Sequence, residues 1–301
     1  MATPPARRPL LSHAGRPAQY PITVVDESGT ARDIHIPMER ALTLYVDRRE
    51  LVTLMTLGLE PEWLALGYLR TQGLVDALDD IAAVQVDWEV EAVAVRTRQG
   101  IEDWDARLGV RTVTTGCGQG TMFGRLSERA AATRVEAPLL RQSALYALGD
   151  RLRLRDTLYK RTGSVHGCAL CAGGEVLCFV EDVGRHNAVD AIAGWMWLEG
   201  VEGAAKLFYT TGRLTSEMVL KTAQMGVPVL VSRSGTTQAA VELARRIGVT
   251  LIGRLRNRHF FVYHGAERVR FDAVPPALPR TQGGKEHLPA DEAALSPEGR
   301  P

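Results

Sequence analysis

Ionisable side chains crowd residues 181–186, which read E-D-V-G-R-H. The apolar run V-L-C-F-V precedes them, and apolar residues at helical spacing follow them as far as Met196. This order predicts a strand, a tight turn and a helix, with Asn187 as the N-cap and Asp190 favouring the positive end of the helix dipole. Ligands of α/β proteins usually lie at such a junction, although a solvated, salt-bridged turn would have the same composition. The candidate side chains are Glu181, Asp182, Arg185 and His186.

Arginine recurs in the loops after the later predicted strands, within the runs T-T-G-R, S-R-S-G-T-T and G-R-L-R-N-R-H. Because the carboxyl ends of parallel strands meet at one edge of a sheet, these side chains can converge there. Nearby hydroxyls and helix N-termini add donors, and the combination suits a ligand with several phosphates. A solvated surface charge is the alternative for each arginine taken singly. The residues concerned are Arg185, Arg213, Arg233, Arg254, Arg256 and Arg258, with the hydroxyls of Thr210, Thr211, Ser232, Ser234, Thr236 and Thr237.

One cysteine stands in a glycine-rich segment, T-G-C-G-Q-G. Glycine is unfavourable in strands and helices, so this composition predicts a loop with Cys117 exposed in it. An incidental cysteine in a surface loop is the alternative.

A zinc site is a second possibility, at His166, Cys168 and Cys171. The spacing C-x-x-C is common in such sites, but structural zinc normally takes four protein ligands. Both cysteines also lie in a predicted strand, where buried, inert thiols are frequent. The motifs H-x-E and P-C-x-x-C of zinc nucleobase deaminases are absent from the sequence, so burial is favoured over zinc binding.

The composition narrows the classes of function. The 301 residues carry a formal net charge of +1, which gives no reason to expect binding to nucleic acid or to an anionic membrane. No apolar run approaches the roughly 20 residues of a membrane span, and the N-terminus lacks the apolar core of a signal peptide. We therefore expect a cytoplasmic protein. Four cysteines are too few for a disulfide framework in a chain of this length.

The first part of the chain is predicted to be small and α+β. Residues 1–20 are rich in proline and arginine and predict a disordered tail. Residues 21–110 combine a hairpin from Pro21, strands at 41–46, 81–86 and 90–96, and a helix that begins at Pro61 and closes near Gly73. Residues 111–137 are expected to form a mobile loop around Cys117.

The second part, residues 138–272, is predicted to be an α/β domain. A helix from Pro138 to about Tyr159 comes first, and strands then alternate strictly with helices. Such alternation predicts right-handed crossovers and a largely parallel sheet. Residues 273–301, again rich in proline, glycine and charge, predict a second disordered tail.

Six segments of the chain resemble the FdhD family. They are T-G-C-G at Cys117, T-G-S-V-H-G from Thr162, E-D-V-G-R-H-N-A-V-D from Glu181, T-G-R-L-T-S-E-M-V from Thr211, G-V-P-V-L-V-S-R-S-G-T-T and V-T-L-I-G-R-L-R. The resemblance covers about residues 21–272. The members of this family are sulfur carrier proteins required for formate dehydrogenase activity. It implies a cytoplasmic sulfurtransferase, often a homodimer, with a cytidine-deaminase-like C-terminal domain. Such a protein takes sulfur from a cysteine desulfurase as a persulfide and passes it to the bis-molybdopterin guanine dinucleotide cofactor of formate dehydrogenase.

The resemblance also implies roles for individual residues. Cys117 matches the persulfide cysteine, and the segment matching the family's cofactor-binding stretch comprises Arg254, Leu255, Arg256, Asn257, Arg258 and His259. Two departures stand out. The family loop often reads C-x-x-C, whereas Gly120 here leaves Cys117 as a single carrier thiol. The cofactor-binding stretch often contains glycine, whereas this one reads R-L-R-N-R-H.

These observations predict a sulfurtransferase in which the Cys117 thiolate accepts sulfane sulfur and the arginine-lined sheet edge binds the nucleotide phosphates of the cofactor. The protein is expected to need no metal of its own. One alternative is a chaperone that holds the cofactor or the apo-enzyme without transferring sulfur. Another is a zinc hydrolase of the same fold.

Overall fold

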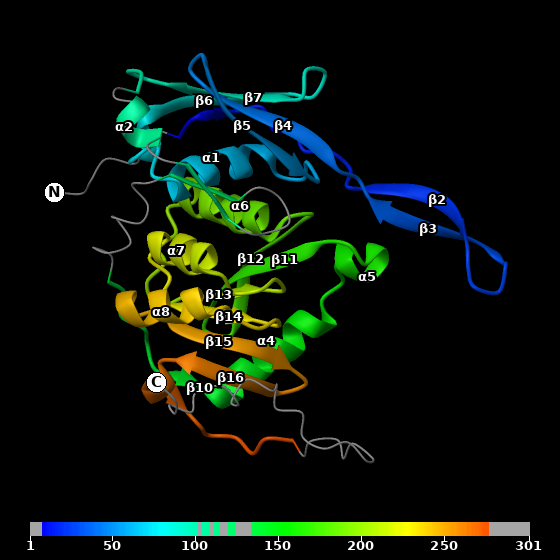
Figure 1. Ribbon diagram of the computed structural model, residues 1–301, viewed down its shortest axis with the longest axis vertical. Coiled ribbons are helices and arrows are strands. Elements are labelled where there is room, and N and C mark those ends of the chain that lie inside the picture. Colours follow the sequence, from blue (N-terminus) through cyan, green and yellow to red (C-terminus); the bar gives the residue numbers. More distant parts are fainter. Residues whose placement is uncertain (1–7, 102–103, 109–110, 115–119, 124–133, 277–301) are drawn as a thin grey trace, which may run out of the picture.

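A six-stranded mixed sheet forms the centre of the C-terminal part (Figure 1). The computed structural model describes residues 8–101, 104–108, 111–114, 120–123 and 134–276. In spatial order the strands are β12 (Glu175–Asp182), β11 (His166–Ala172), β13 (Leu207–Thr210), β14 (Val229–Ser232), β15 (Thr250–Arg256) and β16 (His259–His264).

Only the middle of this sheet is parallel, so the expectation of a largely parallel sheet is corrected. The strands β13, β14 and β15 run parallel, whereas β11 is antiparallel to both β12 and β13, and β16 is antiparallel to β15. Two tight connections explain the difference, because antiparallel neighbours can be joined by a short hairpin and parallel ones cannot. Gly173 and Gly174 join β11 to β12, and Asn257 and Arg258 join β15 to β16; all four residues have positive φ.

Helices cover both faces of the six-stranded sheet. On one face lie α6 (Arg185–Leu198), α7 (Ser216–Gln224) and α8 (Gln238–Ile247), and on the other lies α4 (Gln142–Leu154). The single helix predicted from Pro138 to Tyr159 is in fact β10 (Leu140–Arg141), α4 and a separate short helix, α5 (Leu158–Thr162). The break comes at Arg155, whose backbone is extended, and Thr157 starts α5 by accepting a hydrogen bond from the Lys160 amide.

The N-terminal part adds a five-stranded sheet and one helix. The sheet order is β1 (Leu10–Leu11), β6 (Ile81–Asp87), β7 (Ala92–Thr97), β4 (Arg40–Val46) and β5 (Arg49–Thr56), and helix α1 (Pro61–Thr71) lies between this sheet and α6. A short 3-10 turn, η1 (Leu78–Asp80), precedes β6.

Helices α1 and α6 cross at two glycines. A Cβ on Gly67 would lie 1.6 Å from the Asp190 carbonyl oxygen, and one on Gly194 would lie 2.0 Å from the Trp63 carbonyl oxygen. The two backbones therefore touch, and a single apolar core continues from the five-stranded sheet through α1 and α6 to the six-stranded sheet.

Residues 8–20 differ from the disordered tail expected there. Leu10 and Leu11 pair with β6, and the Glu62 carboxylate accepts hydrogen bonds from Ser12 Oγ at 2.6 Å and the Ala14 amide at 2.8 Å. Ala18 is buried. The proline-rich composition hid these contacts because they are made chiefly by backbone groups and by one distant carboxylate.

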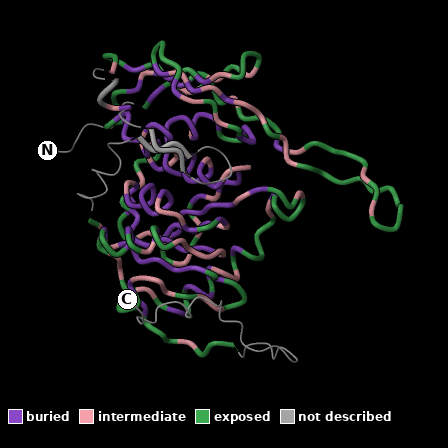
Figure 2. Tube along the Cα trace, viewed as in Figure 1, coloured by how far each residue is buried: buried purple, intermediate pink, exposed green. Residues whose placement is uncertain are grey.

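A two-stranded arm leaves the body of the protein. It consists of β2 (Gln19–Val25) and β3 (Ala31–Pro37), which pair only with each other among the described residues and are exposed along most of their length (Figure 2). Ala18, at its root, belongs to a small apolar cluster with Leu57, Leu158 and Val165.

The remaining described elements are short. They are α2 (Trp104–Leu108), a second 3-10 turn, η2 (Ala266–Arg268), β17 (Val269–Arg270), which pairs with β10, and a hairpin of β8 (Arg111–Thr114) with β9 (Gly120–Phe123) inside the predicted loop. Cys117 and residues 277–301 lie outside the described residues. Within the described ranges, no helix has the length and apolar character needed to cross a membrane.

Candidate cofactor-binding edge

Four strand ends and their loops meet at one edge of the six-stranded sheet. The pairs His166 with Asp182, Cys168 with Thr210, and Thr210 with Ser232 place the start of β11 beside the ends of β12, β13 and β14. The mixed topology preserves this convergence because β12, two strands away from β13, runs in the same direction. The loops that carry the predicted arginines therefore leave the sheet on the same side.

Hydrogen bonds fasten two of these loops to each other. Ser232 Oγ donates to the Gly212 carbonyl oxygen at 2.6 Å, and Ser234 Oγ donates to the Thr211 carbonyl oxygen at 2.8 Å. A β-bridge joins Leu214 to Thr236. The Ser232 hydroxyl, expected to contact a ligand, is thus buried and positions a loop instead.

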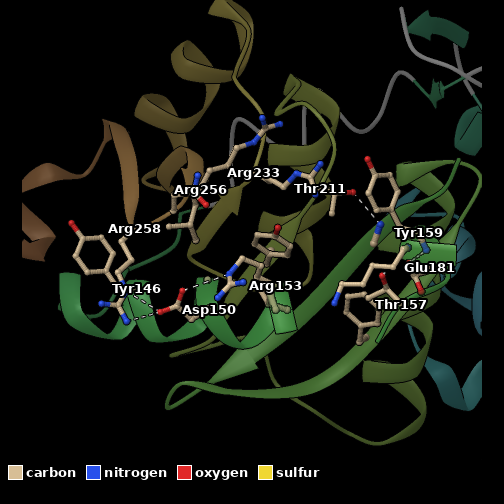
Figure 3. Close-up of a pocket in the computed structure, with 18 residues that line it drawn as sticks. Tyr146, Asp150, Arg153, Thr157, Tyr159, Glu181, Thr211, Arg233, Arg256 and Arg258 are labelled. Carbon is tan, nitrogen blue, oxygen red and sulfur yellow. Dashed lines mark hydrogen bonds and ion pairs between the residues drawn. The ribbon is translucent and has the colours of Figure 1, made fainter. Parts of the chain in front are cut away.

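A cavity of about 370 Å³ opens between this edge and helix α4 (Figure 3). Its walls combine aromatic rings with several cations and two carboxylates. They are formed by Tyr146, Gly149, Asp150, Leu152, Arg153, Thr157, Tyr159, Lys160, Gly167, Phe179, Glu181, Tyr209, Thr211, Arg233, Leu255, Arg256, Asn257 and Arg258.

Glu181 positions one end of this cavity. Its carboxylate accepts hydrogen bonds from the amides of Leu158 at 2.6 Å and Tyr159 at 2.9 Å, the first two residues of α5. A carboxylate at a helix N-terminus is favourable because those amides have no partner within the helix. The Arg233 guanidinium in turn lies over the Tyr159 ring, with its Cζ atom 5.3 Å from the centre of the ring. Glu181 therefore places Tyr159 and, through it, supports Arg233.

A second cavity, of about 310 Å³, shares Tyr159 and Arg233 with the first and includes His166. Thr211 and Arg256 line both cavities. Burial, helped by the positive charges of Arg185 and Arg213, lowers the pKa of His166. The imidazole is therefore neutral at pH 7 and can act as both donor and acceptor there.

The predicted cofactor-binding residues fall into three groups. Arg233, Leu255, Arg256, Asn257 and Arg258 line the larger cavity, where Arg258 Nε also donates to Asp150 Oδ2 at 2.9 Å. Arg254, Arg213 and His259 line neither cavity; Arg254 and Arg213 are exposed, and Arg254 lies over the Phe261 ring. Arg185, His186 and Ser232 are buried behind the edge.

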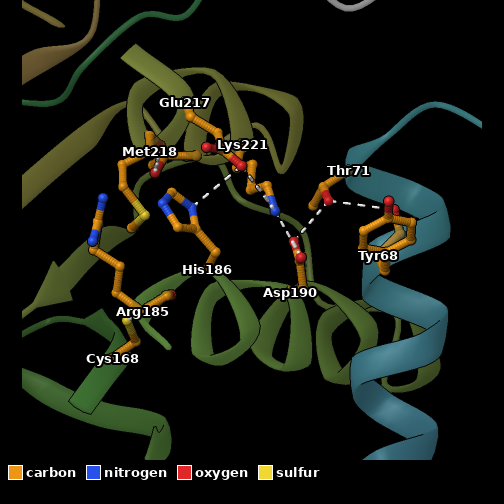
Figure 4. Close-up of polar contacts among 10 residues, drawn as sticks. Tyr68, Thr71, Cys168, Arg185, His186, Asp190, Glu217, Met218 and Lys221 are labelled. Atoms are coloured by element: carbon orange, nitrogen blue, oxygen red, sulfur yellow. Dashed lines mark hydrogen bonds and ion pairs between the residues drawn. The ribbon is translucent and has the colours of Figure 1, made fainter. Parts of the chain in front are cut away.

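The buried group extends into an ionic cluster between α6, α7 and α1 (Figure 4). Lys221 Nζ contacts Asp190 Oδ2 at 2.7 Å and Glu217 Oε1 at 3.7 Å, and Thr71 Oγ1 donates to Asp190 Oδ1 at 2.7 Å. His186 Nδ1 lies 3.3 Å from Glu217 Oε1, and burial lowers the pKa of His186 to about 3. Asp190 thus joins three helices rather than interacting with a helix terminus.

Asn187 is also placed differently from its prediction as an N-cap. Gly184 is the N-cap of α6, and Asn187 Nδ2 donates to the Met55 carbonyl oxygen and to Asp182 Oδ1. Asp182 Oδ2 also accepts from Thr56 Oγ1 at 2.6 Å and the Leu57 amide at 3.2 Å. These contacts bind the end of β5 to the turn before α6, so the E-D-V-G-R-H-N segment is chiefly a structural junction.

The three described cysteines are poor nucleophiles. Cys168, Cys171 and Cys178 are buried, and burial raises the pKa of each thiol to about 12. Cys168 packs in the core beneath α6, whereas Cys171 packs in the core beneath α4 on the opposite face of the sheet. The two sulfurs therefore cannot bind one metal ion together, and in the described part of the chain no group of three His, Cys, Asp or Glu residues could hold one.

Sequence reasoning missed much of the cavity wall. Tyr146, Asp150 and Arg153 recur at helical spacing on α4 and could have been found as a polar and aromatic face of that helix. Tyr159, Lys160 and Phe179 come from elements whose approach depends on the tertiary fold, and no local signal marks them.

Comparisons with known proteins agree with this architecture. Residues 37–270 match the model of the FdhD/NarQ family. The sulfur carrier protein FdhD of Listeria monocytogenes serotype 4b is 30% identical over 249 residues, covering 81% of this chain and 95% of that protein. The Bacillus subtilis protein of the same name is 32% identical over 234 residues, covering 77% and 89%.

A solved structure is similar as well. The crystal structure assigned to a formate dehydrogenase accessory protein from Desulfotalea psychrophila matches with a TM-score of 0.67 and 26% identity, covering 84% of this chain and all of that one. The mixed α/β fold with its short parallel portion is shared with that protein. The family match covers more than three quarters of the chain, and the chain therefore belongs to the FdhD/NarQ family.

Proposed function

We propose that this protein is a sulfurtransferase that carries sulfur as a persulfide on Cys117 and delivers it to the molybdenum cofactor of formate dehydrogenase. The names of its relatives, sulfur carrier protein and formate dehydrogenase accessory protein, support this proposal. The observation that carries the binding step is the cavity beside the sheet edge, in which aromatic rings and arginines face one space.

In the proposed loading step, the Cys117 thiolate attacks the terminal sulfur of a persulfide on a cysteine desulfurase. A new sulfur–sulfur bond forms on Cys117, the bond in the donor persulfide breaks, and the donor cysteine leaves as a thiolate. The step needs a thiolate. The raised pKa values of Cys168, Cys171 and Cys178 make those three side chains unsuitable for it, which leaves Cys117 among the four cysteines.

In the proposed binding step, a nucleotide end of bis-molybdopterin guanine dinucleotide, the substrate of the transfer, enters the larger cavity. The volume of about 370 Å³ is within the range of small-molecule sites. Tyr146, Tyr209 and Phe179 offer aromatic faces for a planar base. Arg233 and Arg256, which line both cavities, offer charged hydrogen bonds to phosphates.

Mass spectrometry tests the carrier step directly. After incubation with a cysteine desulfurase and cysteine, the protein should gain one sulfur on Cys117, and Cys117→Ser should gain none there. Cys178→Ser is the matched control and should load normally. The proposal is supported if the wild type carries sulfur on Cys117 and if Cys117→Ser cells lose both this sulfur and formate dehydrogenase activity. Full activity of Cys117→Ser cells with unchanged cofactor binding would favour the chaperone alternative.

A further inference from the structure

The two sides of the larger cavity differ in chemistry. Tyr146 and Asp150 of helix α4 form one side, and Thr211 and Arg233 lie across the space from them (Figure 3). Arg233 and Arg256 pair with no carboxylate of the described chain, and the second cavity, which both residues also line, has no Asp or Glu in its described wall. Anionic groups of a ligand are therefore favoured on the Arg233 side.

Asp150 retains one oxygen without a hydrogen-bond donor in the described part of the chain. Its Oδ2 accepts from Arg258 Nε at 2.9 Å and from Arg258 Nη2 at 2.8 Å, which joins α4 to the turn between β15 and β16. Its Oδ1 lies 3.9 Å from Arg153 Nε, beyond hydrogen-bond distance. An ionised carboxylate can only accept, so a ligand group that binds Oδ1 must be an N–H or O–H donor.

Glu181, the other carboxylate of this cavity, is already engaged. Its two oxygens accept from the amides of Leu158 at 2.6 Å and Tyr159 at 2.9 Å, so the charge is directed to the N-terminus of α5. Donor groups of a ligand therefore find their acceptor at Asp150.

The Watson–Crick edge of guanine matches this acceptor. Guanine carries its N1–H and its N2 amino group side by side, whereas adenine has a bare nitrogen acceptor at N1 next to its amino group. Tyr146 lies four residues before Asp150 and so on the same side of α4, where its ring gives an apolar wall for a planar base. Gln142 Nε2 fixes that ring by donating to the Tyr146 hydroxyl at 2.7 Å.

We propose that Asp150 selects guanine over other bases, with the base against helix α4 and the phosphates directed to Arg233 and the second cavity. The inference rests on the nucleotide binding proposed above, and it adds the residue that reads the base and the direction in which the ligand lies. Guanine donates its N1–H and N2 amino hydrogens to the carboxylate. Adenine would instead place the N1 lone pair against a negative charge.

Isothermal titration of the full chain with GDP, ADP and xanthosine diphosphate tests the proposal. The wild type should bind GDP most tightly. In Asp150→Asn the amide oxygen can keep Arg258, and the amide nitrogen then meets the ligand as a donor. Guanine offers only donors there, whereas xanthine has a carbonyl oxygen in place of the amino group. The variant should therefore bind GDP roughly 10- to 100-fold more weakly, and xanthosine diphosphate more tightly, than the wild type does.

Asp156→Asn is the matched control. Asp156 pairs with Arg161 at 2.8 Å but is exposed and lines neither cavity, so this variant should bind all three nucleotides as the wild type does. Equal weakening of GDP and xanthosine diphosphate in Asp150→Asn would show that Asp150 only holds Arg258 in place, and would overturn the proposal. An unchanged preference for GDP in Asp150→Asn would overturn it as well.

The wild-type titrations separate this inference from the proposed function. A wild type that binds none of the three nucleotides refutes the proposed binding step and the role of Asp150 with it. A wild type that binds all three equally refutes only the role of Asp150. The losses of GDP affinity in Asp150→Asn and Arg233→Ala should add in the double variant, because the two side chains contact different ends of the ligand. Strong coupling between them would overturn the proposed direction of the ligand.

Discussion

At the scale of single residues, the structure separates arginines that the sequence could not rank. All of them were expected in loops after strands, but Arg254 and Arg256 lie within β15 itself. Arg233 and Arg256 line both cavities, whereas Arg213 is exposed and lines neither. The difference depends on where each loop turns after its strand. A hydrogen bond from Ser234 Oγ to the Thr211 carbonyl oxygen holds the loops after β13 and β14 together. In this arrangement Arg213 lies outside both cavities.

Arg233→Ala should therefore weaken the binding of GDP, used as a probe for the nucleotide end of the cofactor. The lost charged hydrogen bond predicts a decrease of about 1.5 to 3 kcal/mol in binding free energy. Isothermal titration at two salt concentrations measures it. Arg213→Ala removes the same kind of side chain from outside the cavities, and this variant should bind GDP nearly as the wild type does. Equal losses in both variants would contradict this placement of the site.

His186 predicts a pH dependence of stability. Its folded-state pKa is lowered to about 3 by burial, whereas the unfolded value is near 6.5. Between these values the unfolded chain binds more protons, so stability falls as the pH drops below 6.5. From pH 7.5 to pH 5.5 the contribution of His186 should be about 1 kcal/mol. Urea denaturation of wild type and His186→Gln at both pH values should show a smaller fall in the variant; an identical fall would refute this role.

At the scale of elements, local patterns predicted the β2–β3 hairpin, helix α1 and the later strand and helix pairs, because each has a clear period and clear ends. The same patterns could not predict sheet order. The hairpins β11–β12 and β15–β16 make the outer pairings antiparallel. Their two-residue turns, Gly173–Gly174 and Asn257–Arg258, are a local signal of a hairpin, but no local pattern shows that β11 lies between β12 and β13. The cytidine-deaminase-like description of this domain stays a prediction.

The site was predicted in part for a related physical reason. The sequence could place strand ends and loop arginines at one edge, because the direction of a strand and its C-terminal loop are local properties. It could not place α5, a five-residue helix held by the distant Glu181 carboxylate. The roles of Glu181 and Asp182 were hidden as well, because the partners that tie them to other elements, Tyr159 for Glu181 and Thr56 for Asp182, lie 22 and 126 residues away.

Glu181→Gln should loosen α5 without unfolding the protein. Replacing the carboxylate by an amide weakens two charged hydrogen bonds to the amides of Leu158 and Tyr159. We expect faster hydrogen exchange in residues 158–162 and GDP binding weakened roughly tenfold, because Tyr159 no longer supports Arg233. Glu175→Gln, at the exposed start of the same strand, is the control and should change neither. Weaker binding without faster exchange would argue for direct ligand contact by Glu181 instead.

The crossing of α1 with α6 gives another prediction for elements. Gly67→Ala should destabilise the protein by about 3 kcal/mol or more, because the new methyl group would meet the Asp190 backbone and the helices would have to separate. Gly149→Ala is the matched control in helix α4, since its Cβ would meet only the Leu255 side chain at 3.5 Å. Helix propensity predicts a gain of up to about 1 kcal/mol there. Thermal unfolding measures both; equal melting temperatures would exclude a close helix crossing.

At the scale of the whole molecule, the two parts read from the sequence share one core. Leu66 and Leu69 on α1 belong to the same apolar cluster as Ile192 on α6 and Leu230 on β14. Polar contacts also hold the two parts together: Asp182 joins the end of β5 to the turn before α6, and Asp190 joins α1 to α7. The N-terminal region and the six-stranded sheet should therefore unfold together, although each has the composition of a separate unit.

Residues 8–18 also pack on this shared core, so their removal should destabilise the protein. Deleting residues 8–18 would remove the pairing of β1 with β6 and the bond from Trp88 Nε1 to the Ala14 carbonyl oxygen, and would leave the buried Glu62 carboxylate without Ser12 and Ala14. Losing the partners of a buried charge costs about 1 to 3 kcal/mol or more, so the melting temperature should fall by about 10 °C. Deleting residues 281–301, whose composition predicts a disordered tail, should leave it unchanged. If both truncations melt alike, Glu62 finds other partners and the N-terminal segment contributes no stability.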